Sequence, residues 1–398
     1  MHAMRCRSLA RFGVFSPVAG VAILMIGGCA APDANSEALM ASDDEWHVSA
    51  DSTHRFTLAA KDACTECISV SREVVLGDDS NDGFVDMTTA VTLDSLGRWW
   101  VGQKGHLKVY EPSGALAKRV GRQGAGPSEF GKPVPVHTDA TGAVHILDPY
   151  NQRETVVNSD FSIQRESRLP VTDFFSATSI RDGKEYALSA WVPNASSIGL
   201  AVHVVRGGDD SIRSFDAPEV EGGLQPFHLN RLLAADYNGH LFSAQRFSFD
   251  VVAFTLEGER VATFSGPQLN AHPLKGAVHN LSDNPLPSEI LSIRADRQQR
   301  LWILSKRIRD NWKSHVVEVV RPNGQIGLEV KPGKELSADS FFTGRLEVVD
   351  LKRRRIVAHA DLANLMDGFI AENLLFQNSL TELGKPRIVV WRISEKVP

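Results

Sequence analysis

Residues 91–101 read VTLDSLGRWWV, and this stretch decides the fold. A short run of strand-forming residues leads into an Asp-containing turn that ends in glycine, and a second apolar run follows. An aspartate side chain accepts backbone hydrogen bonds inside a tight turn, and glycine tolerates a positive φ, so the stretch predicts a β-hairpin. The same pattern returns in residues 136–147, 232–242 and 291–304, with a weaker copy in residues 180–188.

The hairpins recur at the spacing of a repeated structural unit. At intervals of roughly 40 to 60 residues, their turns carry an aspartate: Asp94, Asp139, Asp182, Asp236 and Asp296. A second hairpin follows some of the first ones, and two consecutive hairpins form a four-stranded meander, which is the unit of a propeller blade. From Trp46 onward the sequence shows short alternating runs and no long helical period, as in all-β proteins.

Two further segments resemble a known family. Residues 121–130, GRQGAGPSEF, resemble the glycine-rich link between successive blades of NHL-type six-bladed β-propellers. Residues 148–153, DPYNQR, resemble the Asp-x-x-Asn-x-Arg motif of the same family. The likeness covers residues 86–170 and becomes degenerate beyond them. The wider layout, with a cysteine pair before the first blade, is similar to six-bladed propeller lipoproteins of bacteria, a group that implies no general activity.

The two ends of the predicted domain are expected to meet in one blade. Residues 68–77 read as an outermost strand, and residues 387–391 as the last strong strand. The C-terminal blade should therefore contribute three strands and borrow its fourth from the N-terminus, which leaves no open edge between the first and last blades. An extra hairpin is predicted at residues 316–330, inserted in the fifth blade. The predicted fold is an all-β, NHL-like six-bladed propeller over residues 46–398.

The first residues predict export and a lipid anchor. Three arginines within residues 5–11 precede an uncharged, mostly apolar run at residues 12–26, which suits a signal peptide better than a membrane span. Residues 26–29, IGGC, resemble a bacterial lipobox. The resemblance implies that residues 1–28 are removed and that Cys29 carries lipid chains such as palmitate, which hold the protein in the bilayer. The alternatives are an ordinary secretory signal with an incidental cysteine, and a single-span anchor.

The lipidated cysteine is followed by a flexible tether, which spans residues 29–45 and is small, polar and acidic. Ala30 follows Cys29 directly, and an aspartate at this position would resemble an inner-membrane retention signal. Because the sequence has alanine there, we expect a lipid-anchored envelope protein of the outer membrane, facing the periplasm or the exterior. Loss of the three arginines lowers the formal net charge from −5 to −8. A mildly acidic domain binds a nucleic-acid phosphate backbone poorly, so we expect no nucleic-acid partner. We also expect the protein to be a monomer.

Cys64 and Cys67 remain in the mature chain as a C-x-x-C pair. In an oxidising compartment a local disulfide is the simplest prediction. A thioredoxin-type redox pair would open a helix, whereas residues 68–76 alternate like a strand. A zinc site would need two more ligands, and the sequence contains neither a second C-x-x-C nor a paired histidine motif.

Candidate ligand residues are few, because the sequence carries no G-x-S-x-G, H-E-x-x-H, P-loop or EF-hand motif. Asp148, Asn151 and Arg153 could line a ligand site, but hydrogen bonding within and between blades is the favoured interpretation. His137 and His145 lie on adjoining strands and could share a metal, yet they lack a clear third ligand, which favours packed histidines. Packing between blades also accounts for four tryptophans: Trp99, Trp100, Trp302 and Trp391.

The leading functional hypothesis is an envelope binding or scaffold module for an unidentified protein or glycan, without a cofactor. The alternative is a hydrolase or lyase with calcium or zinc in the central channel, as in the gluconolactonase-like and calcium-esterase groups that the fold resembles. The acidic and amide ligands of those groups find no residue-by-residue match in this sequence. A redox protein that uses Cys64 and Cys67 is the third hypothesis.

Overall fold

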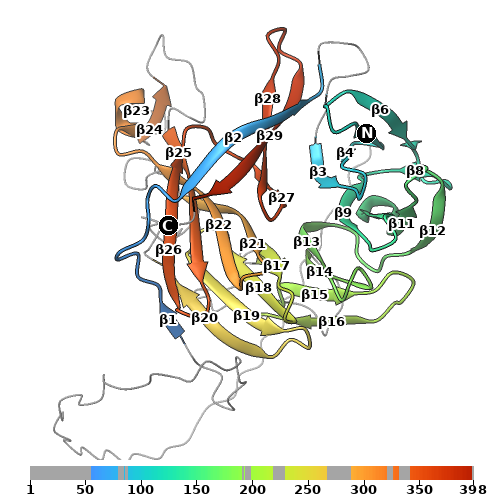
Figure 1. The fold of residues 1–398 in the computed structure, drawn as a ribbon, viewed down its shortest axis with the longest axis horizontal. Helices are drawn as coiled ribbons and strands as arrows, with labels where there is room; N and C mark the ends of the chain where they lie inside the picture. The colour runs from blue at the N-terminus through green and yellow to red at the C-terminus, as the bar shows by residue number, and fades with distance from the viewer. Residues whose placement is uncertain are drawn as a thin grey trace, which may run out of the picture. The chain divides into compact units, whose positions relative to one another are not determined.

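The computed structural model describes residues 55–78, 85, 88–190, 192, 199–217, 229–266, 288–320, 326–330 and 341–396. The chain divides into Met1–Trp46 and His47–Pro398, and the described residues all belong to the second unit. The predicted signal peptide, Cys29 and the tether therefore lie outside the described residues. In the second unit, six antiparallel sheets follow one another around a common axis (Figure 1). The prediction of an all-β, six-bladed propeller is confirmed.

Blades 1 to 3 each use one continuous stretch of chain, with the first strand innermost. The strands of blade 1 are β3 (Thr88–Leu93), β4 (Trp99–Gln103), β5 (His106–Tyr110) and β6 (Leu116–Val120). The strands of blade 2 are β9 (Val134–Thr138), β10 (Val144–Asp148), β11 (Arg153–Val157) and β12 (Ile163–Arg168). The strands of blade 3 are β13 (Phe174–Ile180), β14 (Glu185–Ala190), β15 (Val202–Val205) and β16 (Ile212–Phe215).

Blades 4 to 6 depart from this simple plan. The strands of blade 4 are β17 (Arg231–Ala235), β18 (His240–Gln245), β19 (Asp250–Thr255) and β20 (Arg260–Ser265). The strands of blade 5 are β21 (Glu289–Ala295), β22 (Arg300–Ile308), β25 (Phe342–Asp350) and β26 (Arg355–Leu362). The strands of blade 6 are β27 (Gly368–Ala371), β28 (Leu374–Leu380), β29 (Pro386–Glu395) and, from the N-terminal side, β2 (Ile68–Leu76).

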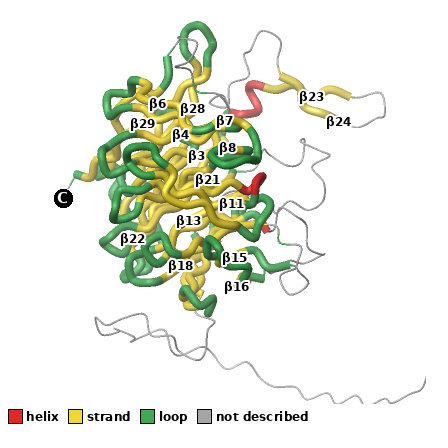
Figure 2. Tube along the Cα trace, turned by 90° about the vertical axis from the view of Figure 1, so that its right-hand side faces the viewer, coloured by secondary structure: helices red, strands yellow, loops and turns green. Residues whose placement is uncertain are grey.

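Ring closure follows the prediction. β2 pairs antiparallel with β29, from Ile68 opposite Glu395 to Leu76 opposite Ile388, and Figure 1 shows the two strands side by side. The predicted inserted hairpin is also confirmed: β23 (Val316–Val320) and β24 (Ile326–Val330) pair with each other between β22 and β25. The short 3-10 helix Trp312–His315 leads into this hairpin, which projects away from the stack of blades in Figure 2.

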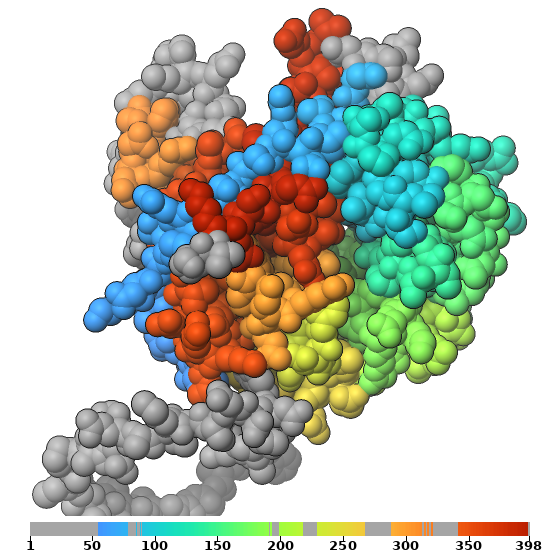
Figure 3. Space-filling view, viewed as in Figure 1, coloured from blue at the N-terminus to red at the C-terminus, as the bar shows by residue number. Residues whose placement is uncertain are grey.

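The segment before β2 covers the outer edges of two further blades, which the sequence did not indicate. β1 (Arg55–Thr57) pairs parallel with β20 as a fifth strand of blade 4. The chain then crosses the edge of blade 5, where Cys64 accepts the backbone N–H of His359 at 3.0 Å and donates its own to Val357 at 2.9 Å. Residues 55–76, which we call the N-terminal strap, therefore occupy backbone groups on the edges of blades 4, 5 and 6 that would otherwise face water. Figure 3 shows this strap lying over the C-terminal blades.

Aspartates close the turn between the first and second strands in four blades. In blade 1, Asp94 Oδ1 accepts the backbone N–H groups of Leu96 at 3.0 Å and Arg98 at 2.9 Å, while Oδ2 accepts the indole N–H of Trp100 at 2.9 Å. Asp139, Asp236 and Asp296 hold their turns with the same pair of backbone bonds. In blade 3 the turn between Ile180 and Glu185 contains Asp182, but within the described residues its carboxylate does not accept the pair of backbone N–H groups seen in the other four blades.

The core lies between blades. Trp100 is fully buried and Trp302 is 2% exposed, each with its indole N–H bound to the turn aspartate of its own blade. Each tryptophan therefore packs its apolar body without leaving a buried donor unsatisfied. The packed faces lie against the next blade, as in the cluster that joins Trp99 of blade 1 to Leu374 and Val390 of blade 6.

Candidate functional site

The inner strands of all six blades surround a central channel. The cavity has a volume of about 880 Å³ and is lined by residues of β3, β9, β13, β17, β21 and β27. A space of this size accommodates a small organic molecule. Its wall mixes aliphatic and aromatic side chains with many polar ones, so the channel is the candidate functional site.

The penultimate residue of every inner strand lines the channel. These six residues form one level of the repeat: Thr92, His137, Ser179, Ala234, Arg294 and Ile370. Their cross-strand partners on the second strand are large in five blades: Trp100, His145, Tyr186, Phe242 and Trp302. The repeat therefore places a bulky, mostly aromatic layer between the blades and a variable layer at the channel wall.

Arg294 differs from the other basic residues of the channel wall. Lys132 pairs with Asp173 at 3.1 Å, and Arg181 pairs with Glu185 at 3.0 Å. The Arg294 guanidinium makes no hydrogen bond or ion pair with any residue that the structure describes. Burial lowers the pKa of Arg294, and the nearby Tyr237 and Glu372 oppose that shift. Since a guanidinium stays protonated in proteins, Arg294 presents a positive charge to the channel.

Three residues from successive blades meet at the channel mouth near Arg294. The Tyr237 hydroxyl of blade 4 donates to Glu372 Oε1 of blade 6 at 2.7 Å, and Arg297 of blade 5 lies 3.7 Å from the same oxygen. The Arg297 guanidinium also lies 5.3 Å from the centre of the Tyr237 ring. The Glu372 carboxylate is therefore engaged by these two side chains rather than by Arg294.

A buried polar cluster lies between blades 2 and 3. Glu154 is 1% exposed, and its carboxylate accepts hydrogen bonds from the Tyr186 hydroxyl at 2.5 Å, from Arg165 at 2.9 Å and from Ser167 at 2.9 Å. The Nδ1 atom of His145 lies 3.0 Å from Glu154 Oε1. Burial alone would raise the pKa of Glu154, but these partners outweigh it and lower that pKa to about 2.

The same cluster fixes His145 between two carboxylates. Its Nε2 atom lies 3.2 Å from Asp139 Oδ2, opposite the Glu154 contact of Nδ1. Burial lowers the pKa of His145, but the bonds to Glu154 and Asp139 prevail and raise it above the usual 6.5. The cluster thus ties blade 2 to Tyr186 of blade 3 through charge-assisted hydrogen bonds, which are about twice as strong as neutral ones.

His137 and His145 face each other across β9 and β10, with ring centroids 5.7 Å apart. Both nitrogens of His145 already contact carboxylates. Within the described ranges, no three His, Cys, Asp or Glu side chains lie close enough to share a metal ion. These residues therefore do not fit the calcium or zinc that a metal-dependent enzyme would require.

The structure brings Asp148, Asn151 and Arg153 together around the glycine-rich link. Asp148 accepts the backbone N–H groups of Gly131 at 2.7 Å and Lys132 at 2.9 Å. Asn151, in the 3-10 helix Pro149–Asn151, donates to the Gly124 carbonyl at 2.8 Å, and Arg153 donates to the carbonyls of Gly126 and Glu129. These bonds shape the link, which carries the short strands β7 (Arg122–Gln123) and β8 (Glu129–Phe130). The three side chains are thus used in backbone hydrogen bonds, and none of them appears among the residues that line the channel.

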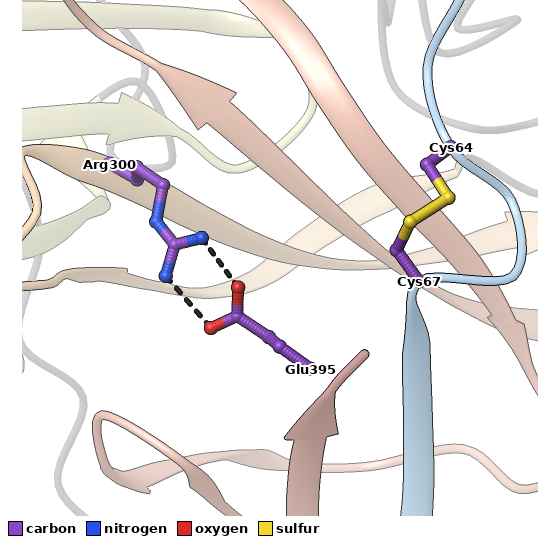
Figure 4. Close-up of a disulfide and its surroundings, with 4 residues drawn as sticks. All are labelled: Cys64, Cys67, Arg300 and Glu395. Atoms are coloured by element: carbon purple, nitrogen blue, oxygen red, sulfur yellow. Dashed lines mark hydrogen bonds and ion pairs between the residues drawn. A yellow bond between two sulfur atoms is a disulfide. The ribbon is translucent and has the colours of Figure 1, made fainter. Parts of the chain in front are cut away.

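Cys64 and Cys67 form a disulfide in the N-terminal strap, with their Cα atoms 5.6 Å apart (Figure 4). The Cys67 carbonyl accepts the backbone N–H of Lys396 at 2.8 Å. Close by, Arg300 of blade 5 forms an ion pair with Glu395 of blade 6. The cysteine pair therefore lies where the strap passes from blade 5 to blade 6, and neither cysteine is among the residues that line the channel.

Sequence reasoning missed Arg294 and the Glu154 cluster. Arg294 had a usable signal, because it stands two residues before the turn aspartate, as His137 does in blade 2. Aligning the repeats at that aspartate would have shown two basic residues at one level of the channel. Glu154 and Tyr186 belong to different blades, and no local pattern connects them.

No protein-family model matches this chain, and no curated protein sequence is similar to it. Solved structures do resemble it in fold. One belongs to a protein of Bacteroides fragilis NCTC 9343 whose name describes it as exported. It shares 12% identity over 87% of this chain and 100% of its own, with a TM-score of 0.53. A member of the DUF4221 family from Bacteroides vulgatus ATCC 8482 shares 8% identity over 83% and 99%, also with a TM-score of 0.53.

Virginiamycin B lyase from Staphylococcus aureus also resembles the chain, with 11% identity over 83% of this chain and 100% of its own and a TM-score of 0.44. That similarity carries no information about activity. At these identities, the matches with TM-scores of 0.53 support the fold alone.

Among the described residues, no helix is long and apolar enough to cross a bilayer.

Proposed function

We propose that this protein is an exported, lipid-anchored binding module whose ligand occupies the central channel. The observation that carries the proposal is the channel itself, a cavity of about 880 Å³ that all six inner strands line. Ligand sites in proteins are concave, largely apolar and equipped with a few polar groups that orient the ligand. This channel is concave, and its wall mixes apolar with polar side chains, among them Arg294, whose charge pairs with no residue that the structure describes.

A channel-filling variant tests the binding role. Ser179 lies at the same level as Arg294 and is partly exposed in the channel wall, so Ser179→Trp should fill part of the channel. The matched control is Leu383→Trp, which adds the same side chain at an exposed turn position. Both variants of the detergent-solubilised full chain are screened against a library of metabolites and envelope sugars by thermal shift.

We expect some compounds to raise the melting temperature of the wild type and of Leu383→Trp, and not that of Ser179→Trp. Circular dichroism of each variant checks that the propeller is intact. A library without any stabilising compound, or stabilisation that survives in a folded Ser179→Trp protein, would refute the proposal.

The anchor has its own test. The lipobox-like residues 26–29 support export and lipid attachment at Cys29, with residues 1–28 removed. Labelling of cells with radioactive palmitate should mark the wild-type protein and leave Cys29→Ser unlabelled, and the variant should leave the outer-membrane fraction. Equal labelling of both proteins would contradict lipidation at this residue.

A further inference from the structure

Arg294 presents a positive charge that pairs with no residue in the described part of the chain. It is partly buried at the channel wall, and no described side chain makes a hydrogen bond to it. Glu372, which interacts electrostatically with Arg294, is engaged by the Tyr237 hydroxyl and by Arg297. A desolvated cation without a bound counter-ion destabilises a fold, so its presence in a cavity points to an external partner.

The arrangement of the blades places a second polar side chain, His137, on the wall of the channel opposite Arg294. His137 occupies the same level of the repeat in blade 2, and blades 2 and 5 face each other across a six-membered ring. Burial is the main cause that lowers the pKa of His137 below 6.5, and the neighbouring His145 lowers it further, so the imidazole is neutral at pH 7. His137 and Arg294 both line the same cavity, from opposite sides of the ring.

The surroundings of this pair favour an organic anion. Ala234 and Ile370 are apolar members of the same level, and Thr92 and Ser179 offer hydroxyl groups. Of the carboxylates on the channel wall, Asp236 accepts backbone N–H groups of its own turn, Asp367 accepts the backbone N–H of Asn378, and Asp182 is exposed at the mouth. An anion between Arg294 and His137 would thus meet a guanidinium fork, an imidazole and hydroxyl groups, with apolar side chains beside them.

We propose that Arg294 and His137 form the polar ends of a binding site for a small organic anion that carries a carboxylate or phosphate group. This inference rests on the channel function proposed above and names the class of its ligand. The planar guanidinium binds either group through two parallel hydrogen bonds, and the apolar side chains of the wall contact the organic body.

Titration calorimetry on the detergent-solubilised full chain tests the site with three probes. Benzoate and phenyl phosphate carry the two anionic groups on the same ring, and benzamide is the neutral counterpart of benzoate. The variant is Arg294→Gln, and the matched control is Arg297→Gln, which removes the neighbouring arginine at the channel mouth.

At least one anionic probe should bind the wild type, and Arg294→Gln should weaken that binding by about tenfold or more, as expected for the loss of charge-assisted hydrogen bonds. Arg297→Gln should change it by less than about twofold, because exposed ion pairs contribute little. Arg294→Gln should also melt no lower than the wild type, since it removes an unpaired cation, whereas a purely structural arginine would leave a less stable protein.

Equal binding of the anions to wild type and Arg294→Gln would overturn the site, as would binding of benzamide that matches benzoate. In both cases a ligand still enters the channel, so the binding function proposed above would stand. Absence of binding by both anions would also overturn the anion site, and the compound screen on Ser179→Trp then decides separately whether the channel binds anything.

Discussion

The buried carboxylate of Glu154 should be one of the main determinants of acid stability in this protein. Its folded-state pKa is about 2, compared with 4.5 for an ordinary glutamate, and the difference corresponds to about 3 kcal/mol of folding free energy. Because the folded-state pKa is the lower one, this stabilisation is fully present above pH 4.5 and is lost as the pH falls toward 2. Glu154→Gln removes the charge that His145 and Arg165 contact, and should therefore cost about 3 kcal/mol at pH 7.

Urea unfolding followed by tryptophan fluorescence measures this effect, since Trp100 and Trp302 lie in the core. The wild type should lose stability between pH 4.5 and pH 2, and the pH dependence of Glu154→Gln should be flatter in that range. Glu111→Gln, at an exposed turn position, is the control and should change the unfolding free energy by less than about 0.5 kcal/mol. A loss below about 1 kcal/mol in Glu154→Gln at pH 7, or an unchanged pH dependence, would refute the reasoning.

Three further predictions concern the same framework. The pKa of His145 is raised in the folded protein, so protonated His145 stabilises the fold fully below pH 6.5, and this stabilisation is lost as the pH rises through the folded-state pKa. His145→Gln should therefore flatten this part of the pH–stability curve. An unchanged curve would contradict the assignment. Asp296→Ala leaves the buried indole N–H of Trp302 without its acceptor and should lower the free energy of unfolding, measured in urea, by about 2 to 4 kcal/mol. A loss below about 1 kcal/mol would contradict this prediction. Cys64→Ser removes a disulfide of sequence separation 3 and should lower the free energy of unfolding by about 2 kcal/mol. Reduction of the wild type should have the same effect. Equal melting temperatures of the reduced and oxidised wild type would argue against this prediction.

The N-terminal strap gives a reason for the position of the disulfide. The strap changes from a parallel strand on blade 4 to an antiparallel strand on blade 6, and it must turn beside blade 5 between them. Cys64 forms an isolated parallel bridge with Ala358 at that point, and three residues later Cys67 precedes the first residue of β2. A short crosslink there limits the freedom of the turn, so the closing strand is held near its pairing partner β29.

The sequence by itself determined the blade repeat, the ring closure and the inserted hairpin. These features depend on local rules: strand alternation with period two, and turn chemistry in which Asp94 or Asp296 accepts successive backbone N–H groups. Closure followed from one unpaired strand segment at each end of the domain. The parallel strand β1 escaped prediction because three residues are too short to show any period.

Only the tertiary structure decided which side chains share a site. Arg294 and His137 line one channel from opposite blades, and Glu154 and Tyr186 form a hydrogen bond between neighbouring ones, so these arrangements depend on the number of blades and on their packing rather than on any spacing along the chain. The burial that shifts their pKa values likewise arises when the blades close around the axis. A repeat places each residue within its blade, whereas the ring places the blades, and the chemistry of the channel is a property of the ring.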